Sequence, residues 1–337
     1  MDYSQILSQQ FNIKEEYAKN IITLLDDGNT IPFIARYRKE MHGSMDDQLI
    51  REFAEKLEYL RGLDKRRDEI RSLIDAQEKL TDEINLALDK AATLSELEDI
   101  YRPYRPKRKT RASIAKEKGL EPLANDILKQ EKGFDPSKSA VDYIDEEKGV
   151  TSVEDAIQGA MDIIAELVSD NAEIRKRIRN LTNANGVLVS VATDEEKDSV
   201  YKNYYDYKEP VKKIAGHRVL AVNRGEKEGF LKVSVETDSE KPLNSIFRAM
   251  ITDKNQLCSD IIREACTDAY QRLIYPSIER EVRNDLTDTA AENAMKVFAV
   301  NLKQLLMQPP VKGKTVLALD PGYRTGCKTA VVDSTGK

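Results

Sequence analysis

Apolar residues recur every three to four positions through the first part of the chain, the spacing that places one stripe of a helix against a core. One such pattern runs from Met45 to Leu88 and is rich in charge. A second follows Thr151, and its apolar positions, which we expect in the core, are Ile157, Ala160, Met161, Ile164 and Leu167. These patterns predict a mainly α, multi-helical region over residues 1–185.

Several polar residues mark where these helices begin and end. The run Asp26-Asp27-Gly28-Asn29 has turn chemistry and predicts a helix stop. Thr93 with Glu96, or Ser95 with Glu98, has the spacing of a capping box, and Thr151 with Glu154 repeats it. We therefore expect new helices after Thr93 or Ser95 and after Thr151.

The spacing of apolar residues changes over residues 186–310, for which we predict a mixed α/β part followed by helix. Residues 186–191 are short and β-branched, which fits a strand or a buried helix end. Residues 218–222 and 230–235 bracket a glycine-containing turn and predict two strands. The helical period returns from Asn255 to Leu306, and Gln308-Pro309-Pro310 ends it because proline cannot continue a helix.

The tail, residues 311–337, predicts a strand over 316–319, a glycine turn and a second strand over 329–332. We interpret this unit as the first strands of a third, α/β domain that continues in sequence not given. Without the rest of that domain, the tail is expected to be poorly packed or to dock on the helices as an edge hairpin.

Charge is segregated along the chain, although the net charge is only −6. From Arg102 to Lys118 there are eight basic residues and one acidic residue, whereas residues 121–173 hold fourteen acidic and four basic residues. Such segregation creates local fields that the net charge hides. With three cysteines, no signal peptide and no long apolar run, the chain is expected in the reducing cytoplasm and away from membranes.

The basic segment contains the cations Arg102, Arg105, Lys107, Arg108, Lys109 and Arg111, interleaved with Tyr101 and Tyr104. Pro103 and Pro106 are expected to hold its backbone extended, so that the side chains splay outward. Cations bind phosphates and aromatic rings stack on unpaired bases, so the composition fits a nucleic-acid contact. The alternative is a rigid connector whose arginines pair with nearby acidic helices.

Two smaller basic clusters are interpreted as solvated helix faces. They are Arg175-Lys176-Arg177-Arg179 and the group Arg36, Arg38 and Lys39. Cys258 and Cys266 lie eight positions apart on one helical stripe and are expected in the core. His42 and His217 are the only histidines, and no cysteine–histidine spacing matches a zinc site.

Asp320 ends an apolar strand at a Pro-Gly turn, the position of a metal-binding carboxylate in ribonuclease-H-like nucleases. That chemistry needs several carboxylates, and Asp333 is the only other acidic residue in this unit. The turn therefore points to a fold superfamily, shared with actin-like phosphotransferases, and not to an activity.

Six stretches together resemble the bacterial transcription accessory protein family of the Tex type. They are TIPFIARYRKE from Thr30, LEDIYRPYRPKRKTRASIAKEKGLEPLA from Leu97, HRVLAVNRGEKEG from His217, DAYQRLIYPSIEREVR from Asp268, VFAVNLKQLLMQPP from Val297 and ALDPGYRTGCKTAVVDSTGK from Ala318. Their order and spacing span the whole chain.

The resemblance implies a helical N-terminal part with a helix-turn-helix-like element, followed by a YqgF-type ribonuclease-H-like domain that starts near residue 311. It also implies helix-hairpin-helix units and an RNA-binding S1 domain beyond Lys337, and a layout similar to the core of a eukaryotic transcription elongation factor. The YqgF-type domain of such proteins is regarded as lacking a complete catalytic carboxylate set. Asp320 matches its strand-end aspartate, so a divalent metal is implied there only in a full-length protein, and no other cofactor is implied.

The function expected from these observations is that of a nucleic-acid-binding transcription accessory protein, seen as its non-catalytic scaffold portion, with RNA or single strands as partner. A metal-dependent nuclease or resolvase of the ribonuclease H type is the alternative in the full-length chain. A third interpretation is a protein-binding platform for RNA polymerase or the ribosome. These three interpretations stay open at this point.

Overall fold

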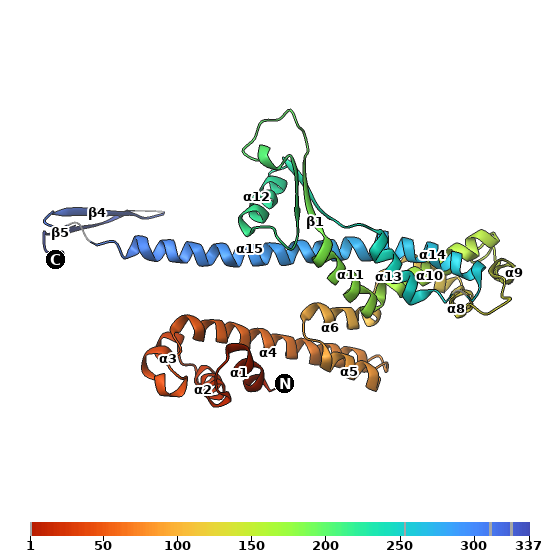
Figure 1. Ribbon diagram of the computed structural model, residues 1–337, viewed down its shortest axis with the longest axis horizontal. Coiled ribbons are helices and arrows are strands. Elements are labelled where there is room, and N and C mark those ends of the chain that lie inside the picture. The colour runs from red at the N-terminus through yellow and green to blue at the C-terminus, as the bar shows by residue number, and fades with distance from the viewer. Residues whose placement is uncertain (1, 253, 310–311, 324–325) are drawn as a thin grey trace. The chain divides into compact units, whose positions relative to one another are not determined.

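A computed structural model describes residues 2–252, 254–309, 312–323 and 326–337. Its backbone contacts form two compact units (Figure 1). The first comprises Met1–Leu181 and Asp238–Ile278, and the second comprises Thr182–Thr237 and Glu279–Lys337. The fold is mainly α with two small antiparallel sheets among the described residues, as the sequence predicts.

The first unit is helical. Its helices are α1 (Tyr3–Phe11), α2 (Glu15–Asp26), α3 (Ile31–Tyr37), α4 (Asp47–Asp75), α5 (Asp82–Lys90), α6 (Leu94–Tyr101), α7 (Arg111–Glu117), α8 (Glu121–Lys129), α9 (Pro136–Ala140), α10 (Val153–Asp170), α13 (Glu240–Met250) and α14 (Gln256–Asp268). Short 3₁₀ turns cover Lys39–Met41, Arg102–Tyr104 and Val141–Tyr143. Helix α11 (Ala172–Asn185) begins in this unit.

Helices α1 to α4 share one apolar core that includes Leu7, Ile21, Ile34, Ile50 and Phe53. Helix α2 ends at Asp26 and the chain turns at Gly28, which has a φ of +78°, as the turn residues predict. The pattern predicted as one helix from Met45 to Leu88 is divided into α4 and α5. The break follows from Glu78, whose φ of +56° leaves the helix, and from the new N-cap at Thr81.

Helix α10 packs against α7, α8 and α14. Its N-cap is Ser152, which accepts the amide of Asp155, whereas the sequence predicted a cap at Thr151 with Glu154. The buried stripe is also shifted: Ala156, Ala160, Ile163, Ile164 and Val168 are buried and Leu167 is exposed. Thr93 does cap α6 as predicted, and Glu96 accepts the amide of Ala92.

A three-stranded antiparallel sheet forms the core of the second unit, in the order β2-β1-β3. Its strands are β1 (Val187–Ala192), β2 (Asp206–Pro210) and β3 (Leu231–Glu236). Helix α12 (Gly216–Lys227) packs on β3. Leu188, Val222, Leu231 and Val233 meet Tyr201 in the core between them. Of the two alternatives left open for residues 186–191, the strand is the one observed, and the strand predicted over 230–235 is confirmed.

Residues 218–222 are helical, which makes the predicted strand there wrong. Within α12, Val219, Val222 and Gly225 are buried at intervals of three, a helical spacing that so short an apolar run does not reveal by itself. Gly225 allows the close approach of β3, because a Cβ atom at this position would lie 2.5 Å from a methyl carbon of Leu231.

The helical region from Asn255 onward is confirmed and has one irregularity. A π-helical turn, Ala269–Ile274, separates α14 from α15 (Tyr275–Leu306). Cys258 and Cys266 are buried as predicted. Pro310, one of the two prolines predicted to end the helix, lies outside the described residues.

The tail forms the predicted hairpin, in which β4 (Val316–Pro321) pairs antiparallel with β5 (Cys327–Val332). Every residue of β4 is exposed, as expected of a poorly packed tail. Arg324 and Thr325, for which the sequence predicted a glycine turn, lie outside the described residues. Within the described part of the chain, no helix has the length and apolar character needed to cross a bilayer.

Candidate nucleic-acid interface

The basic segment, residues 102–111, joins α6 to α7 in the first unit. Its start is a 3₁₀ turn over Arg102–Tyr104, so the prediction of an extended backbone throughout is wrong there. Pro103 occupies the first turn, where its fixed φ is compatible with helix and its missing amide costs no hydrogen bond. The backbone is extended at Arg105 and at Thr110.

Tyr104 of the segment and Tyr101 directly before it face inward, and this corrects the expectation that they splay outward. Tyr101 is 6% exposed and belongs to the core formed with Leu63, Ile70 and Leu97. Tyr104 is half-buried against the same core. Neither ring is therefore presented for stacking on a nucleic-acid base.

Part of the segment is braced against α10, as the connector interpretation predicts. Lys107 forms an ion pair with Asp170 and lies 3.4 Å from Glu166, and Arg102 lies 3.5 Å from Asp170. The Thr110 hydroxyl also donates to Glu166 at 3.1 Å. These contacts fix the segment at its start, middle and end.

Thr110 and Ser113 form a reciprocal capping box that starts α7. The Gln77 side chain donates to the Tyr104 carbonyl oxygen at 2.9 Å, which holds the other end of the segment against the end of α4. The backbone that presents the cations is thus ordered by side-chain hydrogen bonds as well as by its prolines.

The remaining cations are exposed. Arg105, Arg108 and Arg111 form no ion pair with any residue that the structure describes. Lys109 lies 3.7 Å from Glu117, but both side chains are about two-thirds exposed, and such surface pairs contribute little. These four residues, called here the exposed basic set, are the part of the segment that is available to phosphates.

The cluster at 175–179 is only partly the solvated face that the sequence predicted: Lys176 and Arg177 are exposed, but Arg175 and Arg179 are buried. Arg175 is 0% exposed, and its Nε donates to Asp99 at 2.5 Å. Arg179 donates to the other oxygen of Asp99 at 2.7 Å. The sequence analysis missed this network because four cations within five residues are typical of an exposed helix face. Ile174 and Ile178, four positions apart and both buried, were the signal that this helix face points inward.

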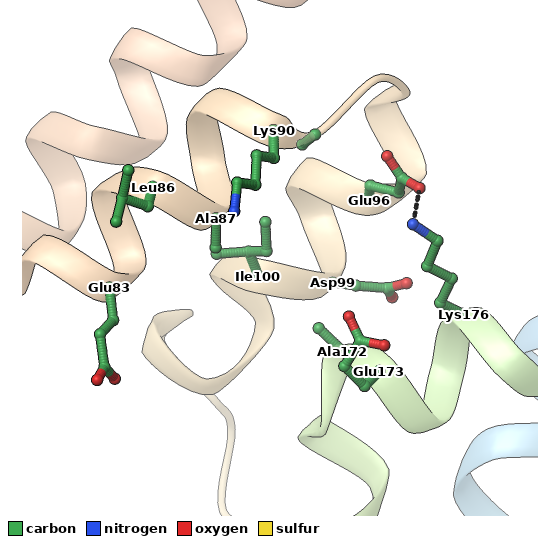
Figure 2. Close-up of a pocket in the computed structure, with 11 residues that line it drawn as sticks. Glu83, Leu86, Ala87, Lys90, Glu96, Asp99, Ile100, Ala172, Glu173 and Lys176 are labelled. Atoms are coloured by element: carbon green, nitrogen blue, oxygen red, sulfur yellow. Dashed lines mark ion pairs between the residues drawn. The ribbon is translucent and has the colours of Figure 1, made fainter.

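A cavity of about 540 Å³ adjoins this network (Figure 2). Its lining comes from α5, α6 and the first turns of α11, with Glu96 and Lys176 joined by an ion pair of 2.7 Å. The ionisable lining residues are Glu83, Lys90, Glu96, Asp99, Glu173 and Lys176. Because carboxylates outnumber cations here, the cavity is a poor site for phosphate, and the basic segment remains the candidate interface.

Asp320 lies exposed at the end of β4, opposite Lys328 of β5. Asp333 follows β5 at the other end of the hairpin, where its carboxylate accepts hydrogen bonds from the Thr335 hydroxyl and the amides of Thr335 and Lys337. Those hydrogen bonds hold the pKa of Asp333 below its ordinary value. The hairpin therefore does not bring the two carboxylates together, and the described residues contain no group of three or more acidic, histidine or cysteine side chains arranged to hold a metal.

Models of three domains of one protein family match this chain in order. The Tex-like protein N-terminal domain matches residues 1–75, the Tex central region-like domain matches residues 131–298, and the Tex protein YqgF-like domain matches residues 314–337. This chain belongs to the Tex family. The recognition based on six sequence stretches is confirmed.

Relatives of the Tex family align with the entire chain. The uncharacterized protein YdcI of Bacillus subtilis is 46% identical over 100% of this chain and 48% of its own length. Protein tex of Bordetella pertussis is 38% identical over 100% of this chain and 45% of its own length. S1 RNA-binding domain-containing protein 1 of Homo sapiens is 32% identical over 100% of this chain and 35% of its own length. The chain thus spans about half, or less, of the curated Tex relatives that it matches.

The matched ranges divide the candidate residues into two groups. Asp320 falls inside the Tex protein YqgF-like match, at residues 314–337. The exposed basic set falls between the matches that end at residue 75 and begin at residue 131.

Proposed function

We propose that this chain is the non-catalytic scaffold portion of a transcription accessory protein and that it contacts nucleic acid itself, RNA or single strands in particular. A relative in Neisseria gonorrhoeae, 38% identical, carries the name transcriptional accessory protein Tex. Others carry the name S1 RNA-binding domain-containing protein 1. Those names support a role in transcription and a nucleic-acid partner. The assignment to the cytoplasm and the domain limits at residues 185 and 310 remain predictions.

The observation that carries the proposal is the exposed basic set, Arg105, Arg108, Lys109 and Arg111. Each cation that meets a phosphate releases a bound counterion, which is the main source of affinity that does not depend on base sequence. The anchoring of Lys107, Thr110 and Tyr104 holds the backbone of the set before any ligand arrives. Less conformational entropy is then lost on binding than from a flexible basic tail.

A salt titration tests this proposal. Fluorescence anisotropy is measured with the 337-residue chain and labelled single-stranded RNA, and the logarithm of the affinity is plotted against the logarithm of the salt concentration. The triple variant Arg105→Glu, Arg108→Glu and Lys109→Glu is expected to lower the steepness of that plot by about 2, at roughly 0.7 for each lost phosphate contact.

The matched control is Lys129→Glu, Lys138→Glu and Lys148→Glu, which changes the net charge equally. Each of these lysines is exposed and pairs with an aspartate three residues away in the acidic part of the chain. The control is expected to leave the steepness near that of the unchanged chain. Equal effects of the two triple variants, or no binding by the unchanged chain at low salt, would contradict the proposed contact.

A nuclease role for a longer chain is the alternative from another class, and it rests on Asp320. One exposed carboxylate opposite Lys328 is too little to align a phosphodiester between two metal ions. We therefore propose no catalysis by residues 1–337. Docking of RNA polymerase or the ribosome is compatible with the proposed role, and a pulldown that survives nuclease treatment would support it.

A further inference from the structure

Helix α3 belongs to the first unit (Figure 1). It carries two aromatic residues whose rings are in contact, Phe33 and Tyr37. Ile34 faces the core and is fully buried, which orients the rest of this short helix. Phe33 and Tyr37, one turn apart, have ring centroids 5.4 Å apart with planes at 43°. Phe33 is half-buried, whereas Tyr37 is 58% exposed and makes no side-chain hydrogen bond to a described residue. An accessible ring is thus held in place by the ring beneath it.

Three cations lie close to Tyr37 in the sequence, at positions 36, 38 and 39. Arg36, Arg38 and Lys39 are all exposed, and none forms an ion pair with a residue in the described part of the chain. The Arg38 guanidinium lies 5.4 Å from the centroid of the Phe33 ring, a cation–π distance. Glu40 is the only acidic residue between Phe33 and Met45. Single exposed tyrosines are common on protein surfaces. Here, however, the other three residues at positions 36–39 are cations without an ion pair to a described residue.

This surface offers an exposed aromatic ring as well as cations. The basic segment offers cations without an exposed ring, because Tyr104 and the adjacent Tyr101 face the core. A nucleic acid offers two features to a protein that ignores its sequence: phosphates, which cations bind, and base faces, on which aromatic rings stack. Base faces are accessible only in single strands, because base pairs in a duplex stack on one another. A surface with exposed rings as well as cations therefore fits single strands better than duplexes.

We propose that the α3 patch, defined as Phe33, Arg36, Tyr37, Arg38 and Lys39, binds single-stranded nucleic acid. An unpaired base stacks on Tyr37, and the cations contact the phosphates on either side. This inference rests on the proposed function and deepens it, since it names a second contact surface and the group on which a base stacks. The positive charge and the accessible ring are the observations that select this occupant.

The test compares Tyr37→Ala with Tyr59→Ala in the 337-residue chain. Tyr59 is a matched control because it is 43% exposed and carries the Lys56 ammonium 4.7 Å above its ring, yet lies outside the patch. Two fluorescein-labelled probes are used: an oligothymidylate of about 12 nucleotides, and an abasic strand of the same length that keeps the sugars and phosphates.

Tyr37→Ala is expected to weaken oligothymidylate binding about tenfold, the effect of one lost stacked base, and to leave binding of the abasic strand unchanged. Tyr59→Ala is expected to leave both unchanged. Tyr37→Phe keeps the ring and should retain affinity. Tyr37→Leu keeps an apolar contact with Phe33 but has no aromatic face, so it should lose affinity as Tyr37→Ala does even if the alanine variant is less stable.

The stacking proposal would be overturned if the Tyr37→Leu, Tyr59→Ala and unchanged chains bound oligothymidylate with equal affinity. The same result is expected if the patch docks an acidic protein and not a nucleic acid. A loss of equal size on the abasic strand would overturn it as well, because stacking needs a base. If this proposal fails but the triple variant of the basic segment still lowers the salt dependence, the proposed function stands. If the unchanged chain binds no probe at low salt, both fail.

Discussion

Asp99 of α6 and Arg175 of α11 form an ion pair in the interior of the first unit, with Arg175 Nε 2.5 Å from Asp99 Oδ1. The second oxygen of Asp99 accepts from Arg179, and Arg175 also donates to Ser277 at 3.0 Å. One buried carboxylate thus accepts hydrogen bonds from two guanidinium groups. The junction of α6 and α11 depends on charge pairing as well as on apolar packing.

Removing the charge of Asp99 should be strongly destabilising. In Asp99→Asn the side chain keeps its size, but two buried guanidinium groups lose the carboxylate that they share. We therefore expect a loss of about 3–5 kcal/mol in the free energy of unfolding. Urea unfolding followed by circular dichroism measures it. The control is Asp26→Asn, which breaks an exposed pair with Arg61 and should cost less than about 1 kcal/mol. Equal losses of unfolding free energy in the two variants would show that the buried ion pair stabilises the chain no more than the exposed one.

The stability of the chain should respond to the protonation of Asp162. Burial raises the pKa of this carboxyl above its ordinary value of 3.8, and this effect outweighs the attraction of Arg272 and Arg111. The folded state therefore binds this proton more tightly than the unfolded state, so the charged form opposes folding at pH values above the raised pKa.

Asp162→Asn is accordingly expected to raise the melting temperature at neutral pH. The difference should shrink as the pH falls through the raised pKa and should disappear below the ordinary value of 3.8. Melting curves of the two proteins across this range check the prediction. A variant less stable than the unchanged chain at neutral pH would mean that the ion pair with Arg272 outweighs burial.

Gly43 and Gly28 offer a matched pair of alanine substitutions. Both have positive φ, +66° and +78°, so alanine should cost each about 1–2 kcal/mol in backbone strain. A Cβ atom at Gly43 would also lie 2.6 Å from the Tyr17 ring, whereas the space around Gly28 is open. We expect Gly43→Ala to cost at least about 1 kcal/mol more than Gly28→Ala in urea unfolding. Equal costs would show that the Tyr17 ring moves aside freely.

The cysteines should differ in reactivity. Burial raises the pKa of Cys266 to about 12 and raises that of Cys258 as well, while Cys327 is exposed on β5. Because the thiolate is the reactive form, a thiol reagent at about pH 8 should label Cys327 alone in the native chain. Cys327→Ser should abolish that labelling, and denaturant should expose the other two thiols. Rapid native labelling of Cys266 would contradict its burial.

Local patterns predicted much of the fold. The stop at Asp26, the cap at Thr93, the strand over 230–235 and the hairpin of the tail are all present, because each depends on residues close together in the sequence. The strand wrongly predicted at Arg218–Val222 has the opposite cause, because its structure depends on residues that are distant in the sequence. A run of five residues has no readable period, and its burial is decided by β3, which packs on α12 only in the folded chain.

In the candidate site too, local sequence does not determine which side chains are exposed. The cations of the basic segment were identified from composition, but the side on which each residue lies depends on partners distant in sequence. Lys107 is held by Asp170, and Tyr101 packs in the core with Leu63 and Leu97. Arg175 was missed for a related reason, since its partner Asp99 lies 76 residues away along the chain.

The β4–β5 hairpin leaves two strand edges open, because the sheet has only these two strands among the described residues. Backbone amides and carbonyls along an open edge are a template for another strand, and a lone two-stranded hairpin is marginally stable in water. Leu317, Leu319 and Val331 add exposed apolar side chains to it. At high concentration, self-association of this chain should therefore begin at the hairpin, and charged substitutions on its apolar positions should delay it.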